Sequence, residues 1–227
     1  MAYKGILLDL DNTLYNYEDA HAVALEKAVN VFHGISKIDK TIILRAYKSA
    51  REKVHIELAE TASSHNRLLY FQKMCEILNV NPLKDALHLY NTYWDCFLEN
   101  MHLFDGVEQF LKNYKGKVCI ITDLTAQIQY RKIKKLNLDK YINYIVTSEE
   151  AGKEKPHQYI FMLCLDKMHL NKNDVCIVGD SFNKDIKGAL SLGMNAYWIN
   201  SNKEDMMHCD IKHVTELGSF KELLEIL

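Results

Sequence analysis

Four aspartates are the residues of this sequence best suited to do chemistry. Asp9 and Asp11 come at the end of one apolar stretch, and Asp180 and Asp185 follow another. Two carboxylates ~4 Å apart repel by about 4 kcal/mol at an effective dielectric constant of about 20. If the four side chains meet, they must therefore take up protons or bind a cation. Magnesium prefers such oxygen ligands and also binds phosphate oxygens, so the aspartates predict a magnesium site for a phosphate ester.

Each aspartate taken alone has a simpler interpretation, which is a turn at a strand end or a helix cap. This alternative fits Asp185 best, because Asp185 lies near the start of a predicted helix. The interpretation as a site depends on whether the chain brings the four residues together.

The elements that would position them alternate between strands and helices. Short apolar runs are typical of strands buried on both faces, and they predict strands at 3–8, 118–122, 144–147, 175–179 and 196–199. Helical patterns fill 126–136, 157–168 and 184–192. This alternation predicts an α/β core with a doubly wound parallel sheet, whose ligands bind at the carboxyl ends of the strands.

A long insertion separates the first two predicted strands. Residues 15–104 carry apolar residues at three-and-four spacing and almost no strand pattern, with helices expected at 18–32, 40–61, 66–78 and 83–100. We expect a helical cap domain at 15–104 and a catalytic core formed by 1–14 and 105–227. After Asp210 the core is expected to end with a short strand or turn and a helix at 219–227.

Composition limits the possible partners. The 28 basic and 30 acidic residues give a net charge of -2, and no basic surface for nucleic acid or membrane is expected. No apolar run approaches the ~20 residues of a membrane span, and no signal peptide is recognised at the N-terminus. The six cysteines, Cys209 among them, lack metal-site spacing and read as packing residues. A cytoplasmic monomer or homodimer is expected.

Four short motifs occur in order at predicted strand ends. They are Asp9-x-Asp11-x-Thr13, then Thr122, then Lys155-Pro156, and finally Gly179-Asp180 with Asp185. Together they resemble the motifs of the haloacid dehalogenase superfamily over nearly the whole chain. The core around Asp180 and Asp185 is similar to that of the phosphatase branch, including N-acylneuraminate-9-phosphatases and nucleotide 5′-phosphatases.

The resemblance implies a role for each motif. Asp9 would attack phosphorus and form an aspartyl-phosphate, and Asp11 would act as general acid and base. Thr122 would hydrogen-bond the phosphoryl oxygens, and Lys155 would neutralise the nucleophile and the developing charge.

The resemblance also implies a cofactor, Mg²⁺. Its ligands would be Asp9, the backbone carbonyl of Asp11, and Asp180, with Asp185 behind them as a support. Asp123 departs from the family pattern, because many relatives carry Asn after the second-motif residue. Its charge near a phosphate must be offset, for which Lys153 or the backbone amides around Leu124 are candidates.

The inserted domain would select the substrate. The polar loop 63–67 leads into a predicted helix, and His65, Asn66 and Arg67, together with Asp123 of the core, are candidate substrate-binding residues. Arg67 suits a carboxylate or a second phosphate. The alternative is a surface loop with Ser64 or Asn66 as the helix N-cap.

Asp11 also discriminates among the activities of the superfamily. Dehalogenases act on uncharged carbon centres and typically lack this second aspartate, so the resemblance favours a phosphatase for a small sugar phosphate or nucleotide. A sugar-phosphate mutase remains an alternative, since the difference lies in the cap. A non-catalytic module that binds phosphorylated ligands is the other, because fold alone does not establish activity.

Overall fold

The computed structural model describes residues 3–201, 203 and 211–227. The chain forms two compact units, Met1–Asn16 with His102–Leu227, and Tyr17–Met101. Cys209 lies outside the described residues, and the five described cysteines carry free thiols. Within the described residues no helix has the length and apolar character needed to cross a membrane.

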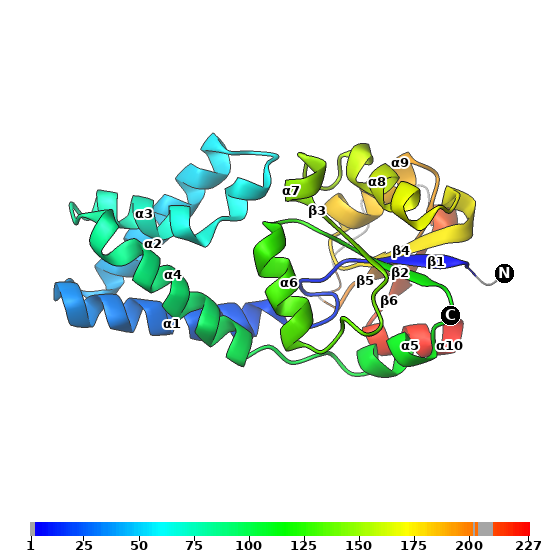
Figure 1. The fold of residues 1–227 in the computed structure, drawn as a ribbon, viewed down its shortest axis with the longest axis horizontal. Helices are drawn as coiled ribbons and strands as arrows, with labels where there is room; N and C mark the ends of the chain where they lie inside the picture. Colours follow the sequence, from blue (N-terminus) through cyan, green and yellow to red (C-terminus); the bar gives the residue numbers. More distant parts are fainter. Residues whose placement is uncertain (1–2, 202, 204–210) are drawn as a thin grey trace. The chain divides into compact units, whose positions relative to one another are not determined.

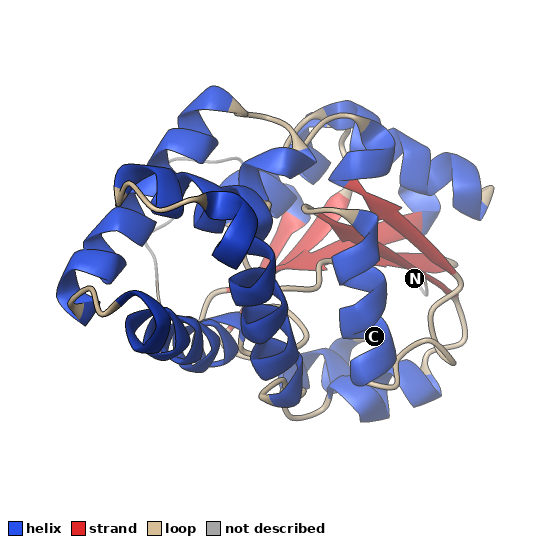
Figure 2. Ribbon diagram, turned by 60° about the vertical axis from the view of Figure 1, so that its left-hand side comes forward, coloured by secondary structure: helices blue, strands red, loops and turns tan. Residues whose placement is uncertain are grey.

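The first unit is built on a six-stranded parallel sheet with the order β3-β2-β1-β4-β5-β6. Its strands are drawn in red in Figure 2. Its strands are β1 (Gly5–Leu8), β2 (Lys117–Thr122), β3 (Tyr144–Thr147), β4 (Val175–Gly179), β5 (Asn195–Ile199) and β6 (Val214–Leu217). All four residues of β1 are buried, which explains the unbroken apolar run. The five predicted strands are confirmed, and β6 is the short strand expected near the C-terminus.

Helices cover both faces of this sheet (Figure 1). The helices of the unit are α5 (Val107–Asn113), α6 (Ala126–Lys135), α7 (Ser148–Ala151), α8 (Gln158–Met168), α9 (Lys187–Ser191) and α10 (Leu223–Ile226). Leu7 is paired with Cys119 and Ile177 in the strand register, and these residues share one buried core with Phe161 of α8. α8 and α9 lie along this face, and α5 and α10 lie along the other.

The strand order places the topological switch point beside β1. From β1 the chain continues to β2 and β3 on one side, whereas β4, β5 and β6 follow on the other. Connections that leave in opposite directions open a crevice at the carboxyl ends of β1 and β4. The predicted doubly wound α/β core is thus confirmed, and its ligands are expected at the carboxyl ends of β1 and β4.

The second unit is helical, as predicted. It contains α1 (Tyr17–Ser36), α2 (Lys40–Glu57), the short 3₁₀ helix η1 (Ala62–His65), α3 (Arg67–Ile77) and α4 (Pro82–Glu99). α1 packs on α4, α4 on α3, and α3 on α2. Side chains cap three helix starts, because Asp39, Asn66 and Asn81 each accept a backbone N–H from the first turn.

Candidate active site

Asp9 lies directly after β1, and only 5% of it is exposed. Its Oδ1 accepts a hydrogen bond from Lys155 Nζ at 2.5 Å, and its Oδ2 accepts one from Thr13 Oγ1 at 2.9 Å. Its backbone N–H donates to Val178 O of β4 at 3.0 Å. The sheet ladder therefore continues as far as Asp9, and the carboxylate is fixed on a rigid strand end.

Asp180 and Asp185 lie on the neighbouring strand end and its following turn. The Asp180 carboxylate accepts a hydrogen bond from Thr13 Oγ1 at 3.3 Å, so one threonine links the first and fourth motifs. Asp185 is fully buried. Its Oδ1 accepts from Lys155 Nζ at 2.7 Å and its Oδ2 accepts from the backbone N–H of Ser181 at 3.0 Å. Asp185 therefore caps a turn and also contacts Lys155.

The turn that holds Asp185 differs from the helix predicted at 184–192. Residues Phe182–Ile186 form a π-helical turn, η3, and α9 begins only at Lys187. Gly179 makes room for this turn, since a Cβ at that position would lie 2.4 Å from Asp185 Oδ2. A side chain there would displace the Asp185 carboxylate, which gives the glycine of the fourth motif a physical reason.

Burial and like charges dominate the electrostatics of this cluster. Burial raises the pKa of the Asp9 carboxyl well above its usual range, against the opposing charge of Lys155. Burial and the charge of Asp185 raise the pKa of Asp180 to about 6. Burial alone lowers the pKa of the Lys155 ammonium, but the carboxylates of Asp185 and Asp9 outweigh it and hold that pKa well above its usual range.

The carboxylates of Asp9, Asp180 and Asp185 form a group able to hold a metal ion, with one oxygen of each within 4.8 Å of the others. Three carboxylates against the one ammonium of Lys155 leave a formal charge of -2 when all are ionised. A hard divalent cation with oxygen ligands, such as Mg²⁺, fits both this charge and this donor set. The carboxylate that completes the cluster is that of Asp185, which the sequence had placed behind the ligands.

Asp11 has a separate set of contacts. Lys132 Nζ of α6 lies 2.7 Å from each carboxylate oxygen, and Tyr15 Oη donates to Oδ1 at 2.5 Å. Sequence reasoning missed Lys132, because it is one of several lysines in a helix rich in them. The available signal was its position on the buried face of α6, where it follows Ile128 and Gln129 at helical spacing.

Thr122 ends β2 as predicted, and its hydroxyl is buried. Its Oγ1 accepts a hydrogen bond from Gln129 Nε2 at 2.5 Å and donates to the carbonyl of Asp123 at 3.3 Å. Asp123 forms an ion pair with Lys184 of η3, whose Nζ lies 2.7 Å from Asp123 Oδ2. Lys184 was not among the partners predicted from the sequence. The backbone N–H of Lys155 donates to the other oxygen at 3.1 Å. These contacts offset the charge that distinguishes Asp123 from asparagine.

The candidate residues of the helical unit are occupied within that unit. Asn66 Oδ1 accepts the backbone N–H of Leu68 at 2.9 Å, so the predicted N-cap alternative is confirmed for Asn66. His65 ends η1, and its ring packs edge-on against His55. Only 6% of Arg67 is exposed, and its guanidinium lies 5.0 Å from the ring centre of Tyr70. Their role in substrate binding stays a prediction.

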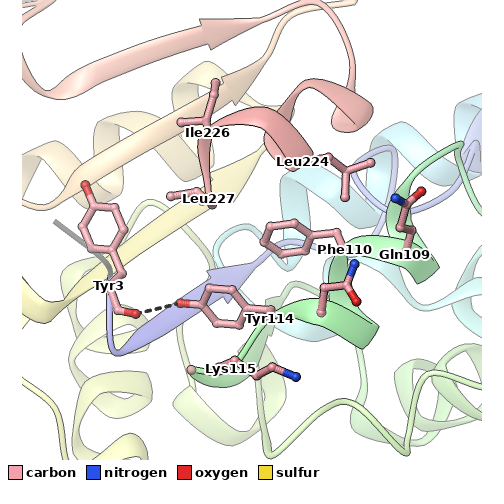
Figure 3. A pocket seen from close by; sticks show the side chains of 10 residues that line it. Tyr3, Gln109, Phe110, Tyr114, Lys115, Leu224, Ile226 and Leu227 are labelled. Atoms are coloured by element: carbon pink, nitrogen blue, oxygen red, sulfur yellow. Dashed lines mark hydrogen bonds between the residues drawn. The ribbon is translucent and has the colours of Figure 1, made fainter.

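Two cavities of the first unit lie at opposite ends of the strands. One, of about 590 Å³, is lined by residues such as Tyr3, Tyr114 and Leu227 and lies where β1 and β2 begin (Figure 3). The other, of about 420 Å³, extends from Asn12 to Ile199 at the end of β5. Only the second borders the loop that carries the first motif, and the larger cavity is remote from the aspartates.

Comparisons with known proteins identify the family to which the chain is similar. The family model for haloacid dehalogenase-like hydrolases matches residues 6–199, which include all four motifs. The chain is 33% identical over 208 residues to the ribulose-1,5-bisphosphate 5-phosphatase of Halopiger xanaduensis, covering 88% of this chain and 86% of that protein. It is 30% identical to the N-acylneuraminate-9-phosphatase of Mus musculus, covering 98% and 95%. The magnesium-bound HAD-hydrolase YfnB from Bacillus subtilis has the same fold, with a TM-score of 0.74, 21% identity and coverage of 100% and 99%.

Proposed function

This chain belongs to the haloacid dehalogenase-like hydrolases and is a phosphatase; we propose that it hydrolyses a small phosphate monoester through a phosphoryl group carried on Asp9. The observation that carries the proposal is the 2.5 Å contact of Asp9 with Lys155 inside the carboxylate cluster. A carboxylate fixed beside an ammonium can approach an anionic phosphorus while the cation offsets the charge.

The first proposed step forms the covalent intermediate. An Asp9 oxygen bonds to phosphorus, and the bond from phosphorus to the ester oxygen breaks. Protonated Asp11 gives its proton to that oxygen, which leaves as an alcohol. Lys155 stays in contact with Asp9 and compensates the charge on the transferring group.

The second proposed step releases phosphate. A water oxygen bonds to phosphorus, Asp11 takes a proton from that water, and the bond from phosphorus to Asp9 breaks. Inorganic phosphate leaves, Asp9 is again a carboxylate, and Asp11 again carries its proton. Thr122 would donate to a phosphoryl oxygen, for which its hydroxyl must turn from the Asp123 carbonyl.

Magnesium would be held by Asp9, Asp180 and the backbone carbonyl of Asp11, with Asp185 supporting the cluster or sharing the ion. When bound, it would draw charge from the phosphoryl oxygens and relieve the repulsion among the carboxylates. The support for this assignment is the charge and oxygen donor set of the cluster.

A sugar phosphate is the proposed substrate class. The two relatives described above are named for a sugar bisphosphate and a phosphorylated sugar acid. Selection of the alcohol would belong to the helical unit, because the motif residues contact only the phosphoryl group in this mechanism.

The test is phosphate release by the purified full chain with Mg²⁺, on a panel of sugar phosphates, nucleotides and one aryl phosphate. We expect release of inorganic phosphate, strongest on a sugar phosphate and lost when a chelator removes the metal. Transfer of the phosphoryl group to another hydroxyl of the sugar would show a mutase instead. If no ester were turned over, the result would support the alternative of a non-catalytic module that binds phosphorylated ligands.

A further inference from the structure

Lys132 is a buried lysine outside the four motifs. It lies on α6, its side chain is 0% exposed, and its Nζ is 2.7 Å from both oxygens of Asp11, whose side chain is 29% exposed. Lysine is almost never fully buried unless it is paired. The sequence separation of 121 residues shows that the pair is a product of the fold.

Tyr15 adds a second contact to the same carboxylate. Its hydroxyl donates to Asp11 Oδ1 at 2.5 Å, and its ring is fully buried, with Lys132 Nζ 5.9 Å from the ring centre. Backbone bridges join Tyr15 to Asp11 and to Leu103. Two side chains from different segments thus fix the direction of the Asp11 carboxylate.

The same face of α6 contacts a second motif. Gln129, three residues before Lys132, is fully buried and donates to Thr122 Oγ1 at 2.5 Å and to the carbonyl of Asp123 at 2.7 Å. Residues three apart share one face of a helix. One turn of α6 therefore contacts the side chains of two motif residues.

Stability alone is a weak explanation for this arrangement. Apolar residues of similar volume in place of both partners of a buried ion pair are often neutral or even stabilising, so packing alone does not require a lysine here. A buried lysine that contacts both oxygens of one carboxylate instead limits where that carboxylate can point.

We propose that Lys132 is the positioning residue of Asp11, holding its carboxylate where it exchanges protons with the leaving group and with water. The inference rests on the proposed function, because it assigns Asp11 the role of acid and base. General acid–base catalysis contributes about 10²–10⁴-fold, and a misplacement of about 1 Å can cost about a hundredfold. Lys132 acts through Asp11 and does not touch the reacting atoms.

The test is Lys132→Met, which removes the ammonium and keeps much of the volume. We expect kcat on an alkyl phosphate to fall roughly a hundredfold, with KM within about threefold of wild type. The matched control is Lys135→Met, which removes an exposed lysine of the same helix and should leave kcat unchanged.

An aryl phosphate separates the two proton transfers. Its leaving group departs as an aryloxide, without a proton, so Lys132→Met should still give a rapid burst of aryloxide of about one equivalent, followed by slow turnover. If the burst and the steady rate fell together, a general structural defect would explain the loss and the proposal would be overturned.

A double-mutant cycle tests whether Lys132 acts through Asp11. In an Asp11→Asn background, Lys132→Met should lower the remaining turnover by less than about twofold, since effects of residues that act as a unit are not additive. Equal losses in both backgrounds would overturn the proposal.

Tyr15→Phe is the second variant if Lys132→Met does not fold. It removes one hydroxyl, and we expect the same pattern with about a tenfold loss, since both contacts of Lys132 with Asp11 remain. Full activity of this variant, with Lys132→Met unfolded, would overturn the proposal. A wild type without turnover would overturn the proposed function itself, whereas an active wild type with fully active Lys132→Met would overturn only the inference.

Discussion

Lys155 of the first unit and Arg67 of the second are both buried cations, and their partners differ. Lys155 is 5% exposed and contacts two carboxylates, those of Asp9 and Asp185. Arg67 is 6% exposed and donates to neutral oxygens, the His65 carbonyl at 2.7 Å and the Tyr17 hydroxyl. Aromatic rings of the helical unit surround its guanidinium at 5.0–5.9 Å, and they belong to Tyr17, Tyr70, Tyr93 and Trp94.

The difference indicates what each cation does. Lys155 contacts Asp9, the proposed nucleophile, as well as Asp185, so removal of Lys155 or Asp9 is expected to change the chemistry. Arg67 sits against negative ring faces, which attract a cation without offering a reactive group. The first cation is therefore expected to affect turnover, and the second chiefly the stability of the helical unit.

The largest expected effect on turnover is that of replacing Asp9, one of the two carboxylate partners of Lys155. Asp9→Asn should lower turnover by at least about a thousandfold, because the amide cannot act as the nucleophile. The melting temperature should stay close to that of wild type, because Lys155 keeps Asp185. Asp11→Asn should lose nearly as much turnover. Steady-state phosphate release and a thermal melt measure both effects, and retained activity in Asp9→Asn contradicts the mechanism.

Removal of Lys155 itself should have the next largest effect. Lys155→Met should lower turnover about 10²–10³-fold, the scale of one preorganised charge-stabilising group. The cluster of three carboxylates then lacks its ammonium, so Mg²⁺ should raise the melting temperature more in this variant than in wild type. An equal metal-induced shift in both proteins would argue against the cluster as the magnesium site.

Arg67→Met should affect stability more than chemistry. Loss of two hydrogen bonds and of the ring contacts should cost about 2 kcal/mol in the unfolding free energy of the helical unit. Turnover of a small aryl phosphate should stay within about threefold of wild type. Urea unfolding and the same assay check this, and a larger loss on a sugar phosphate than on the aryl phosphate would support Arg67 as a substrate-binding residue.

The smallest expected effect is a pH dependence of folding stability, caused by His21 near Arg67. Burial, then the charges of Arg67 and Arg51, lower the pKa of His21 from 6.5 to about 4. Between these values the unfolded chain binds more protons than the folded one, so stability should fall as pH drops from 6.5 towards 4.

Urea midpoints on either side of pH 6.5 in His21→Asn and in the control His33→Asn measure this effect. The pH dependence should weaken in the first variant and persist in the second. An unchanged dependence in His21→Asn would assign it to other groups.

The sequence predicted the parts of this molecule that depend on local pattern. Strand runs ending in Asp9 and Asp180 located the edge of the sheet, since parallel strands buried on both faces are apolar throughout. The helices of the inserted unit followed from their spacing and from caps such as Asn66. The π-helical turn at Asp185 was missed, because it depends on contacts with Ser181 and Lys155.

The missed side chains all depend on proximity created by the fold. Lys132 and Lys184 look like ordinary helical lysines, and each binds an aspartate more than sixty residues away. The sequence offered Lys153 or the backbone amides around Leu124 as partners of Asp123, because no local pattern indicates that Lys184 approaches Asp123. Arg67, at the junction of the polar loop 63–67 and the helix predicted at 66–78, begins α3 and is buried, and its burial was not predicted.

The most direct test of the account is to find the phosphoryl group on the protein. Wild type mixed with Mg²⁺ and a turned-over ester, then quenched in acid during steady state, should carry one phosphoryl group on the peptide that contains Asp9. Peptide mass spectrometry should locate it on Asp9, and Asp9→Asn should carry none. A phosphoryl group on another residue, or one that persists in Asp9→Asn, would contradict the account.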